Sequence, residues 1–94
     1  MTAELAGNAR SLVFLQLAEA LRRLGQLGAA VKVARTGLLR YPELADAHHL
    51  LARVLADQDD RAGAEASWRR VLELTPGHAG ASKGMAFQIG RAHV

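Results

Sequence analysis

The sequence predicts an all-α fold of about five antiparallel helices arranged as a repeat, and three observations lead to it. Alanine, leucine and arginine are abundant while β-branched and aromatic residues are scarce, which is the composition of helices. Apolar residues return at the three- and four-residue spacing of a helix face. The pattern then recurs with a longer, fixed period, as expected when pairs of helices stack on one another.

The five helices follow from the apolar periodicity and from the breakers between the periodic segments. Their predicted ranges are 9–24, 28–40, 44–57, 61–74 and 78–91, with turns at 25–27 and 59–60. Gly7 and Asn8 precede the first periodic segment. Residues 1–8 are therefore interpreted either as a frayed lead-in or as a short extra turn.

Two prolines, Pro42 and Pro76, mark the boundaries of successive units, and their separation sets the period of the repeat. A proline disfavours helical geometry in the residue before it and suits the start of the next helix. A shift by this period superimposes many small and apolar residues: Leu17 on Leu51, Ala18 on Ala52, Leu21 on Leu55, Ala30 on Ala64, Arg35 on Arg69 and Leu38 on Leu72. A further shift aligns Met85, Ala86 and Ile89 with the first helix of the second unit, so a third unit begins with the last helix.

This pattern resembles the tetratricopeptide repeat over roughly Ser11 to Val94. It predicts a single domain over 1–94, with repeat one at about 11–44, repeat two at about 45–78 and a capping helix at about 79–94. The chain departs from the family pattern at two pairs of equivalent positions, where Phe14 corresponds to His48 and Ala34 to Trp68. We interpret these departures as compensation of side-chain volume.

The resemblance implies an alpha-alpha superhelix, a right-handed solenoid whose first helices line a concave face that receives a peptide or a partner helix. Catalysis is not typical of the family. The function expected is therefore that of a protein–protein interaction module, an adaptor or scaffold, whose partner the sequence does not name. The alternative is a self-association module or a part of a longer repeat array, because about three repeats are generally needed for stability.

One face of the first helix has the spacing of a buried face, and its members are expected in the core: Phe14, Leu17, Ala18, Leu21 and Leu24. The family geometry places the neighbouring stripe of each first helix toward the concave side. The residues expected to line this groove are Leu12, Leu15, Glu19, Arg22, Asp46, His49, Arg53, Lys83 and Phe87. Such a groove has mixed charge and an apolar floor, and it suits an amphipathic helix or an extended peptide.

Heat-shock chaperone-binding members of the family hold a C-terminal carboxylate with basic and amide side chains. The corresponding positions here are Leu15, Glu19 and Leu50, with only Lys83 or its neighbours basic, so we do not expect that clamp. The first helix is apolar on nearly every side. Its Leu12, Val13 or Leu15 is expected to be covered by residues 3–6, by a second copy in a homodimer through the end helices, or by the partner.

No cofactor, metal or catalytic site is expected. His48 and His49 point to different faces, and His78 and His93 have no carboxylate or thiolate ligands at a suitable spacing. The chain has no cysteine. The segment 77–84 resembles a phosphate loop but lacks the required lysine followed by serine or threonine, and no strand precedes it. We see no nucleophile, base and orienting group that the fold would gather, so an enzyme is not expected.

The charge pattern and the amino terminus bear on partners and location. The net charge is +3, and the pairs Arg22–Arg23 and Arg69–Arg70 are spread along the chain, so nucleic acid is not expected as a partner. Glu4 does not fit a secretory signal, and no apolar segment is long enough to span a bilayer. These features lead us to expect a soluble, cytoplasmic protein that does not enter a membrane.

Overall fold

The computed structural model describes the backbone of residues 2–92 and the side chains of residues 13–86. It contains five helices: α1 (Thr2–Arg23), α2 (Leu27–Arg40), α3 (Ala45–Asp57), α4 (Arg61–Leu74) and α5 (Ala79–Ala92). No strand occurs in the described backbone. The all-α prediction is confirmed, and the predicted limits of α2 to α5 agree with the structure to within one residue.

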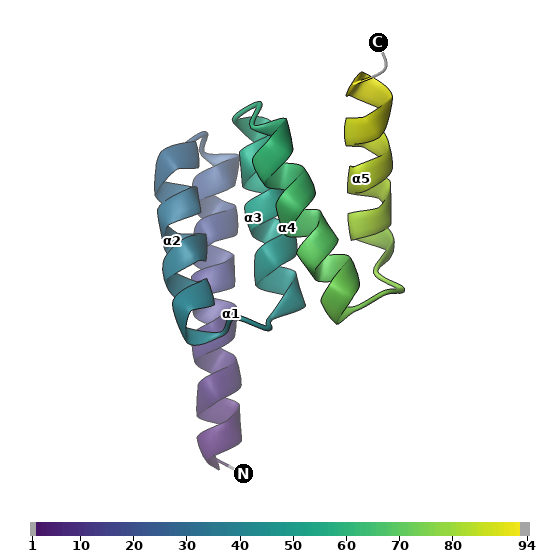
Figure 1. Ribbon diagram of the computed structural model, residues 1–94. Helices are drawn as coiled ribbons and strands as arrows, with labels where there is room; N and C mark the ends of the chain where they lie inside the picture. Colours follow the sequence, from purple (N-terminus) through teal and green to yellow (C-terminus); the bar gives the residue numbers. More distant parts are fainter. Residues whose placement is uncertain (1, 93–94) are drawn as a thin grey trace.

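The helices run alternately up and down and form two layers (Figure 1). In the view of Figure 1, α2 and α4 lie in front of α1 and α3, and α5 follows beside α4. Each helix packs against its neighbours along the chain, and α3 also contacts both α1 and α5. The first helices of the successive units, α1, α3 and α5, are therefore spatial neighbours.

Helix α1 begins earlier than the sequence predicts. It runs without a break from Thr2 through Gly7 and Asn8, so residues 2–8 form part of α1 and neither a frayed lead-in nor a short extra turn; residue 1 lies outside the described residues. A single glycine costs about 1 kcal/mol in a helix interior, which an alanine-rich segment continuing a long helix can absorb. The early part of α1 extends beyond the end of α2 (Figure 1). Residues 3–6 therefore continue the helix axis. They do not fold back over Val13, so the alternative in which these residues cover it is wrong.

The turns within the two units use equivalent positions in the same backbone conformation. Gly25 has a φ of 80°, and Asp59, its equivalent in the second unit, has a φ of 66°. Glycine adopts this left-handed region without a steric penalty, and aspartate is among the few other residues that tolerate it. The next residue, Asp60, caps α4 by accepting a hydrogen bond of 3.0 Å from the backbone N–H of Gly63.

The core is centred on α3, which contributes six buried residues: Ala47, Leu50, Leu51, Ala52, Val54 and Leu55. Ala18, Ala30, Ala34 and Ala64 are also fully buried. Alanines on facing helices let their backbones approach closely. Trp68 and Val71 of α4 also belong to this core, and Trp68 lies against Gly84 of α5.

The core predicted for α1 is only partly correct. Ala18 is buried, and Leu21 packs against the core, but Leu17 is 49% exposed and Leu24 is 74% exposed. Leu24 lies beyond the last residue of α1, in the turn. No described helix precedes α1, whereas α3, which carries the equivalent Leu51, packs against the preceding helix α2, and Leu51 is 7% exposed.

At both positions where the chain departs from the repeat pattern, a change in side-chain size is accompanied by the opposite change in size on another helix. In the first unit Phe14 lies over Gly37, where an added Cβ would overlap its ring, and the equivalent pair in the second unit is His48 and Val71. The ring of Phe14 also stacks on Tyr41, with centroids 6.0 Å apart. A large residue facing glycine is thus replaced by two residues of intermediate size.

The same exchange occurs between units. Trp68 lies over Gly84 of α5, where an added Cβ would overlap the indole. The equivalent positions one unit earlier hold Ala34 and Leu50, which are both buried in the core. Between α2 and α3, the small Ala34 is therefore combined with the large Leu50. Between α4 and α5, the large Trp68 is combined with Gly84. Total volume is conserved at each interface, as tolerated core exchanges require.

Candidate functional site

A polar cluster joins α1 to α3 on the side where the first helices meet. The guanidinium of Arg22 donates two hydrogen bonds to Glu19, of 2.6 and 3.1 Å, and a third of 3.0 Å to Asp57. Glu19 and Arg22 are one helical turn apart on α1, while Asp57 is the last residue of α3. The bidentate contact holds the guanidinium in one orientation and so ties the two helices together.

Two further cations approach Glu19. Its carboxylate lies 3.4 Å from Arg23 Nε and 3.8 Å from Arg53 Nη1 of α3. The hydrogen bonds from Arg22, and then the positive charges of Arg22, Arg53 and Arg23, lower the pKa of Glu19 to about 2, although partial burial acts in the opposite direction. Glu19 is therefore ionised at neutral pH and serves as the anionic centre of the cluster.

His49 connects α3, α4 and α5. Its Nδ1 accepts a hydrogen bond of 3.0 Å from Trp68 Nε1, and its ring centroid lies 4.8 Å from that of His78. An added Cβ on Gly80 would lie 3.0 Å from His49 Cε1, so the glycine permits α5 to approach this ring. His49 thus acts as a packing residue as well as a member of the predicted groove.

The hydrogen bond from Trp68 requires a neutral His49. An indole N–H can only donate, so Nδ1 must carry the lone pair and the imidazole proton resides on Nε2. Burial, followed by the positive charges of His78 and Arg53, lowers the pKa of His49 below 6.5, and Asp46 opposes this shift. His78 caps the start of α5, since its Nδ1 accepts a hydrogen bond of 3.0 Å from the backbone N–H of Ala81.

The structure places four of the predicted groove residues, Leu15, Glu19, Arg22 and Arg53, next to one another. Leu15 is partly buried against the core, and it lines a shallow depression of about 390 Å³ with Gln16, Glu19, Ala20 and Arg23. Glu19, Arg22 and Arg53 form the ionic cluster next to that depression. His49 lies further along α3, between Trp68 and His78.

The remaining predicted groove residues are less closely connected. Asp46 and Lys83 are exposed at the surface of α3 and α5, and neither forms an ion pair with another described side chain. Leu12 and Phe87 lie outside the residues whose side chains are described. Leu50, one of the positions compared with the carboxylate clamp, is buried in the core.

Sequence reasoning missed Trp68 and His78 as neighbours of this surface. The signal that could have identified them is the pair of glycines on α5, because Gly80 and Gly84 each face a large ring. Among residues 13–86, no three histidine, aspartate or glutamate side chains are grouped so that they could hold a metal ion.

Comparison with known protein families agrees with this architecture. The family model described as tetratricopeptide repeat matches residues 12–54, which span most of α1, all of α2 and most of α3. No curated protein matches the chain. The matched segment is therefore similar to the tetratricopeptide repeat, and the five helices of the chain are consistent with such repeats.

The family defines the general class of function. Tetratricopeptide repeats are typically protein–protein interaction modules and not enzymes, so the partners to be expected are proteins. Among the described residues, no helix combines the length and the apolar character that crossing a membrane requires.

Proposed function

We propose that the chain binds a peptide or a partner helix along the surface formed by α1, α3 and α5, and that it acts as an adaptor or scaffold. The residues proposed to line this concave groove are Leu12, Leu15, Glu19, Arg22, Asp46, His49, Arg53, Lys83 and Phe87.

The observation that carries the proposal is the ionic cluster between α1 and α3. Arg22 contacts both Glu19 and Asp57, and Arg53 approaches Glu19 from α3. Side chains that are already held in place lose little conformational entropy when a ligand docks on them. The cluster therefore supports a groove with a preformed polar wall.

The chemistry of the groove indicates the kind of ligand. Leu15 offers an apolar contact next to the Glu19 carboxylate and the Arg23 guanidinium. Arg53 and Lys83 add cations that are accessible to solvent. A segment with one apolar face and acidic residues beside it would match this arrangement in both shape and charge.

Affinity capture with charge-reversed variants tests the proposal. The test variant carries Arg53→Glu and Lys83→Glu, both at solvent-accessible positions on the proposed groove. The matched control carries Arg61→Glu and Arg69→Glu, which make the same change in net charge on α4, outside the proposed groove residues. Circular dichroism would first establish that both variants are folded.

We expect the wild type and the α4 control to retain a partner from cell extract that the Arg53→Glu/Lys83→Glu variant loses. A partner retained equally by all three proteins would contradict the groove proposal. A partner lost only from the α4 control would place binding on the opposite face.

A further inference from the structure

A second groove lies between α1 and α2, on a different side of α1 from the concave groove. It has a volume of about 540 Å³ and contains Val13 and Leu17 of α1 and Val33 of α2. Lys32 and Arg40 of α2, and Tyr41 directly after α2, also line it. Val13 is 62% exposed and Leu17 is 49% exposed. We call this surface the end groove.

The internal repeat indicates what shape of ligand fits the end groove. The equivalents of Val13 and Leu17 in the second unit are Ala47 and Leu51, which are 0% and 7% exposed. Both are buried on α3, and α2 is among the helices that pack against α3. The end groove is thus the same kind of surface as one that accepts a helix elsewhere in this molecule, so a helix is the shape that fits it.

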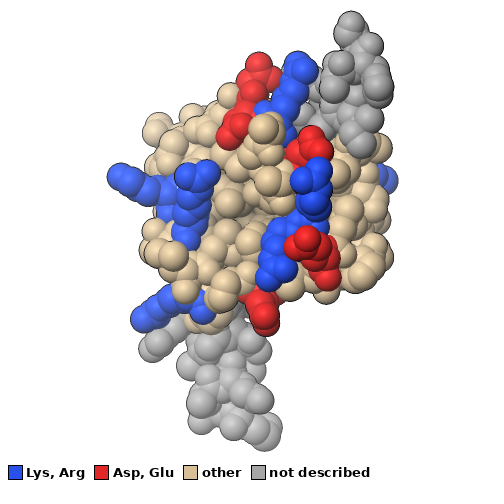
Figure 2. All heavy atoms as spheres, viewed as in Figure 1, with Lys and Arg blue, Asp and Glu red and all other residues tan. Residues whose placement is uncertain are grey.

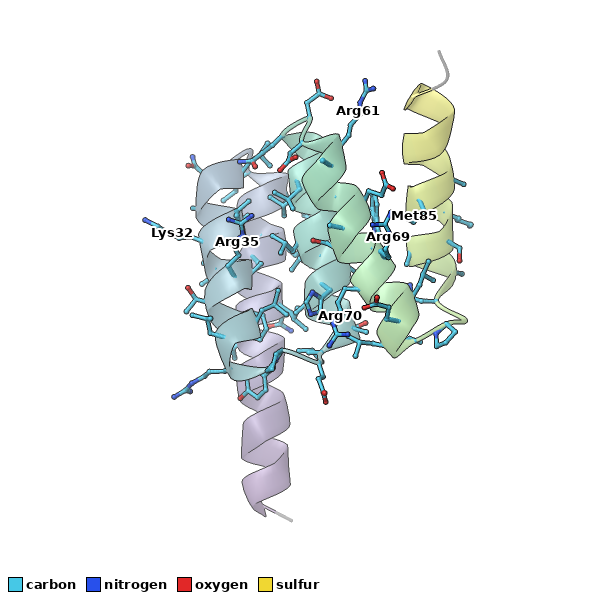
Figure 3. All side chains as sticks on the ribbon, in the orientation of Figure 1. Lys32, Arg35, Arg61, Arg69, Arg70 and Met85 are labelled. Carbon is cyan, nitrogen blue, oxygen red and sulfur yellow. The ribbon has the colours of Figure 1, made fainter. Side chains whose placement is uncertain are left out.

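The charge around the end groove indicates what chemistry that helix carries. Helix α2 contains Lys32, Arg35 and Arg40 and no acidic residue. None of the three forms an ion pair with any side chain in the described range. In Figure 3 the labelled Lys32 projects away from the other helices into solvent.

Helix α4 provides an internal comparison. Its Arg69 pairs with Glu65 at 2.7 Å, and its Arg70 pairs with Glu73 at 3.2 Å. The positions equivalent to these two glutamates on α2 are Val31 and Leu39. Figure 2 shows the result: basic and acidic side chains alternate over α4, whereas those over α2 are basic without acidic neighbours. Among the cations of α2, Arg35 is equivalent to Arg69 and lacks the carboxylate that pairs with Arg69, while Lys32 and Arg40 stand where α4 has the uncharged Ala66 and Leu74.

We propose that the end groove binds an amphipathic helix of a partner protein whose apolar face covers Val13 and Leu17 and whose acidic residues pair with Lys32 and Arg40. A second copy docked through its α2 or its α5 does not meet these requirements. Helix α2 would repel itself across a symmetric contact, and α5 contains no acidic residue. The apolar lining also distinguishes the groove from a site for nucleic acid, which needs cations along a phosphate backbone.

Peptide titration of the ¹⁵N-labelled full chain, followed by amide chemical shifts, tests this assignment. The acidic probe is a blocked peptide with the sequence of residues 27–40 in which the three basic positions carry Lys32→Glu, Arg35→Glu and Arg40→Glu. The control peptide has the native basic sequence. Both keep the apolar residues with which α2 covers α3, so they differ only in charge.

We expect the acidic peptide to shift amides of residues 13–17 and 32–41, and the basic peptide to leave them unchanged. Changing Lys32→Glu and Arg40→Glu in the protein should weaken binding roughly tenfold, because two opposite-charge contacts become repulsive. The Arg61→Glu/Arg69→Glu protein, with the same change in net charge, should bind within about twofold of wild type. Added salt should weaken the interaction.

Several outcomes would overturn the assignment. Equal binding of the two peptides, or no shift with up to about 1 mM acidic peptide, would remove the role of charge. Shifts confined to α1, α3 and α5 residues around Glu19 and Arg53 would assign the peptide to the concave groove. A mass that rises with protein concentration and is restored to monomer by Val13→Gln would identify a second copy as the occupant. Shifts of the end groove by single-stranded DNA would identify nucleic acid instead.

Discussion

At the scale of single residues, side-chain volume is exchanged between facing helices so that the two units differ in detail while keeping the same backbone. Phe14 over Gly37 corresponds to His48 beside Val71, and Trp68 over Gly84 corresponds to Ala34 and Leu50. The sequence predicted that the substitutions at positions 14 and 34 compensate for volume. It did not identify the compensating partners, because these lie on other helices and only packing reveals which residues face each other.

The pair Phe14 and Gly37 should be energetically coupled. Gly37→Val alone adds atoms beneath the Phe14 ring and should destabilise the protein by about 2 kcal/mol, because overpacking a filled core forces side chains and backbone to shift. Adding Phe14→His recreates the pair of the second unit and should recover about 1 kcal/mol relative to the sum of the single changes. Urea unfolding of the four proteins measures this coupling, and additive effects would contradict it.

His49 should make the packing of α5 sensitive to pH. Its pKa is lower in the folded protein than the ordinary value of 6.5, so the unfolded chain binds a proton more readily. The stability that neutral His49 contributes is fully present above pH 6.5 and is lost as the pH falls through the folded-state pKa. Protonation places a second donor against Trp68 Nε1 and removes the hydrogen bond.

Trp68 is the only tryptophan in the chain, so its fluorescence reports this change directly. We expect the emission of the wild type to change as the pH falls below 6.5, and His49→Gln to abolish that transition, since glutamine can accept the hydrogen bond without titrating. His48→Gln is the matched control and should retain it. An unchanged transition in His49→Gln would attribute the signal to another group.

At the scale of helices, the contact between α1 and α3 differs in kind from the contact between α4 and α5. Helices α1 and α3 are connected by the cluster of Glu19, Arg22 and Asp57, whereas α4 and α5 are connected by Trp68 resting on a glycine. The sequence placed four helices accurately because Pro42, Pro76 and the turn residues mark their ends. It misplaced the start of α1, because Gly7 and Asn8 have the residue types of a helix start although the helix continues through them from Thr2.

The cluster should stabilise the protein less in acid. The folded-state pKa of Glu19 is about 2, below its ordinary value of 4.5, so its contribution is present above pH 4.5 and is lost as the pH falls toward 2. Because the carboxylate is partly open to solvent, we expect the loss to be about 1 kcal/mol and not the full amount corresponding to the shift. The comparison of wild type with Glu19→Gln by urea unfolding at several pH values measures it. A constant difference between the two proteins from neutral pH to acid would contradict this assignment.

At the scale of the whole molecule, burial is unevenly distributed among the helices. Helix α3 is covered on several sides and contains six buried residues, whereas Ala81 is the one fully buried residue in the described part of α5. Repeat proteins are stabilised mainly by contacts between neighbouring units, so their ends open more readily than their centre.

Amide hydrogen exchange should therefore show a gradient along the chain. We expect the slowest exchange in α3, close to the limit set by global unfolding, and exchange at least about tenfold faster in α5. Gly84→Ala should increase the exchange of α5 amides more than those of α1, because the added methyl group overlaps the Trp68 indole. Uniform exchange rates across all five helices would show instead that the chain opens as a single unit.

The sequence predicted the fold of the molecule well but its surfaces only in part. Leu17 and Leu24 were expected in the core because helical periodicity identifies an apolar face without showing whether another helix covers it. For the same reason, periodicity could not show that Val13 and Leu17 form part of an exposed groove. Its significance follows from comparing Leu17 with Leu51 and the unpaired Lys32 with the paired cations of α4, and both comparisons need coordinates.

The alternation of large and small residues across the helix interfaces also determines the order in which the units can follow one another. If the second unit were duplicated in tandem, its Trp68 would face a copy of Leu50 where the present chain supplies Gly84, and the two large side chains would collide. If the first unit were duplicated, Ala34 would meet a copy of Gln16, a polar residue where the chain now supplies Leu50. The contacting residues thus determine which unit can follow which. Rearranging the units by recombination would require these residues to change together.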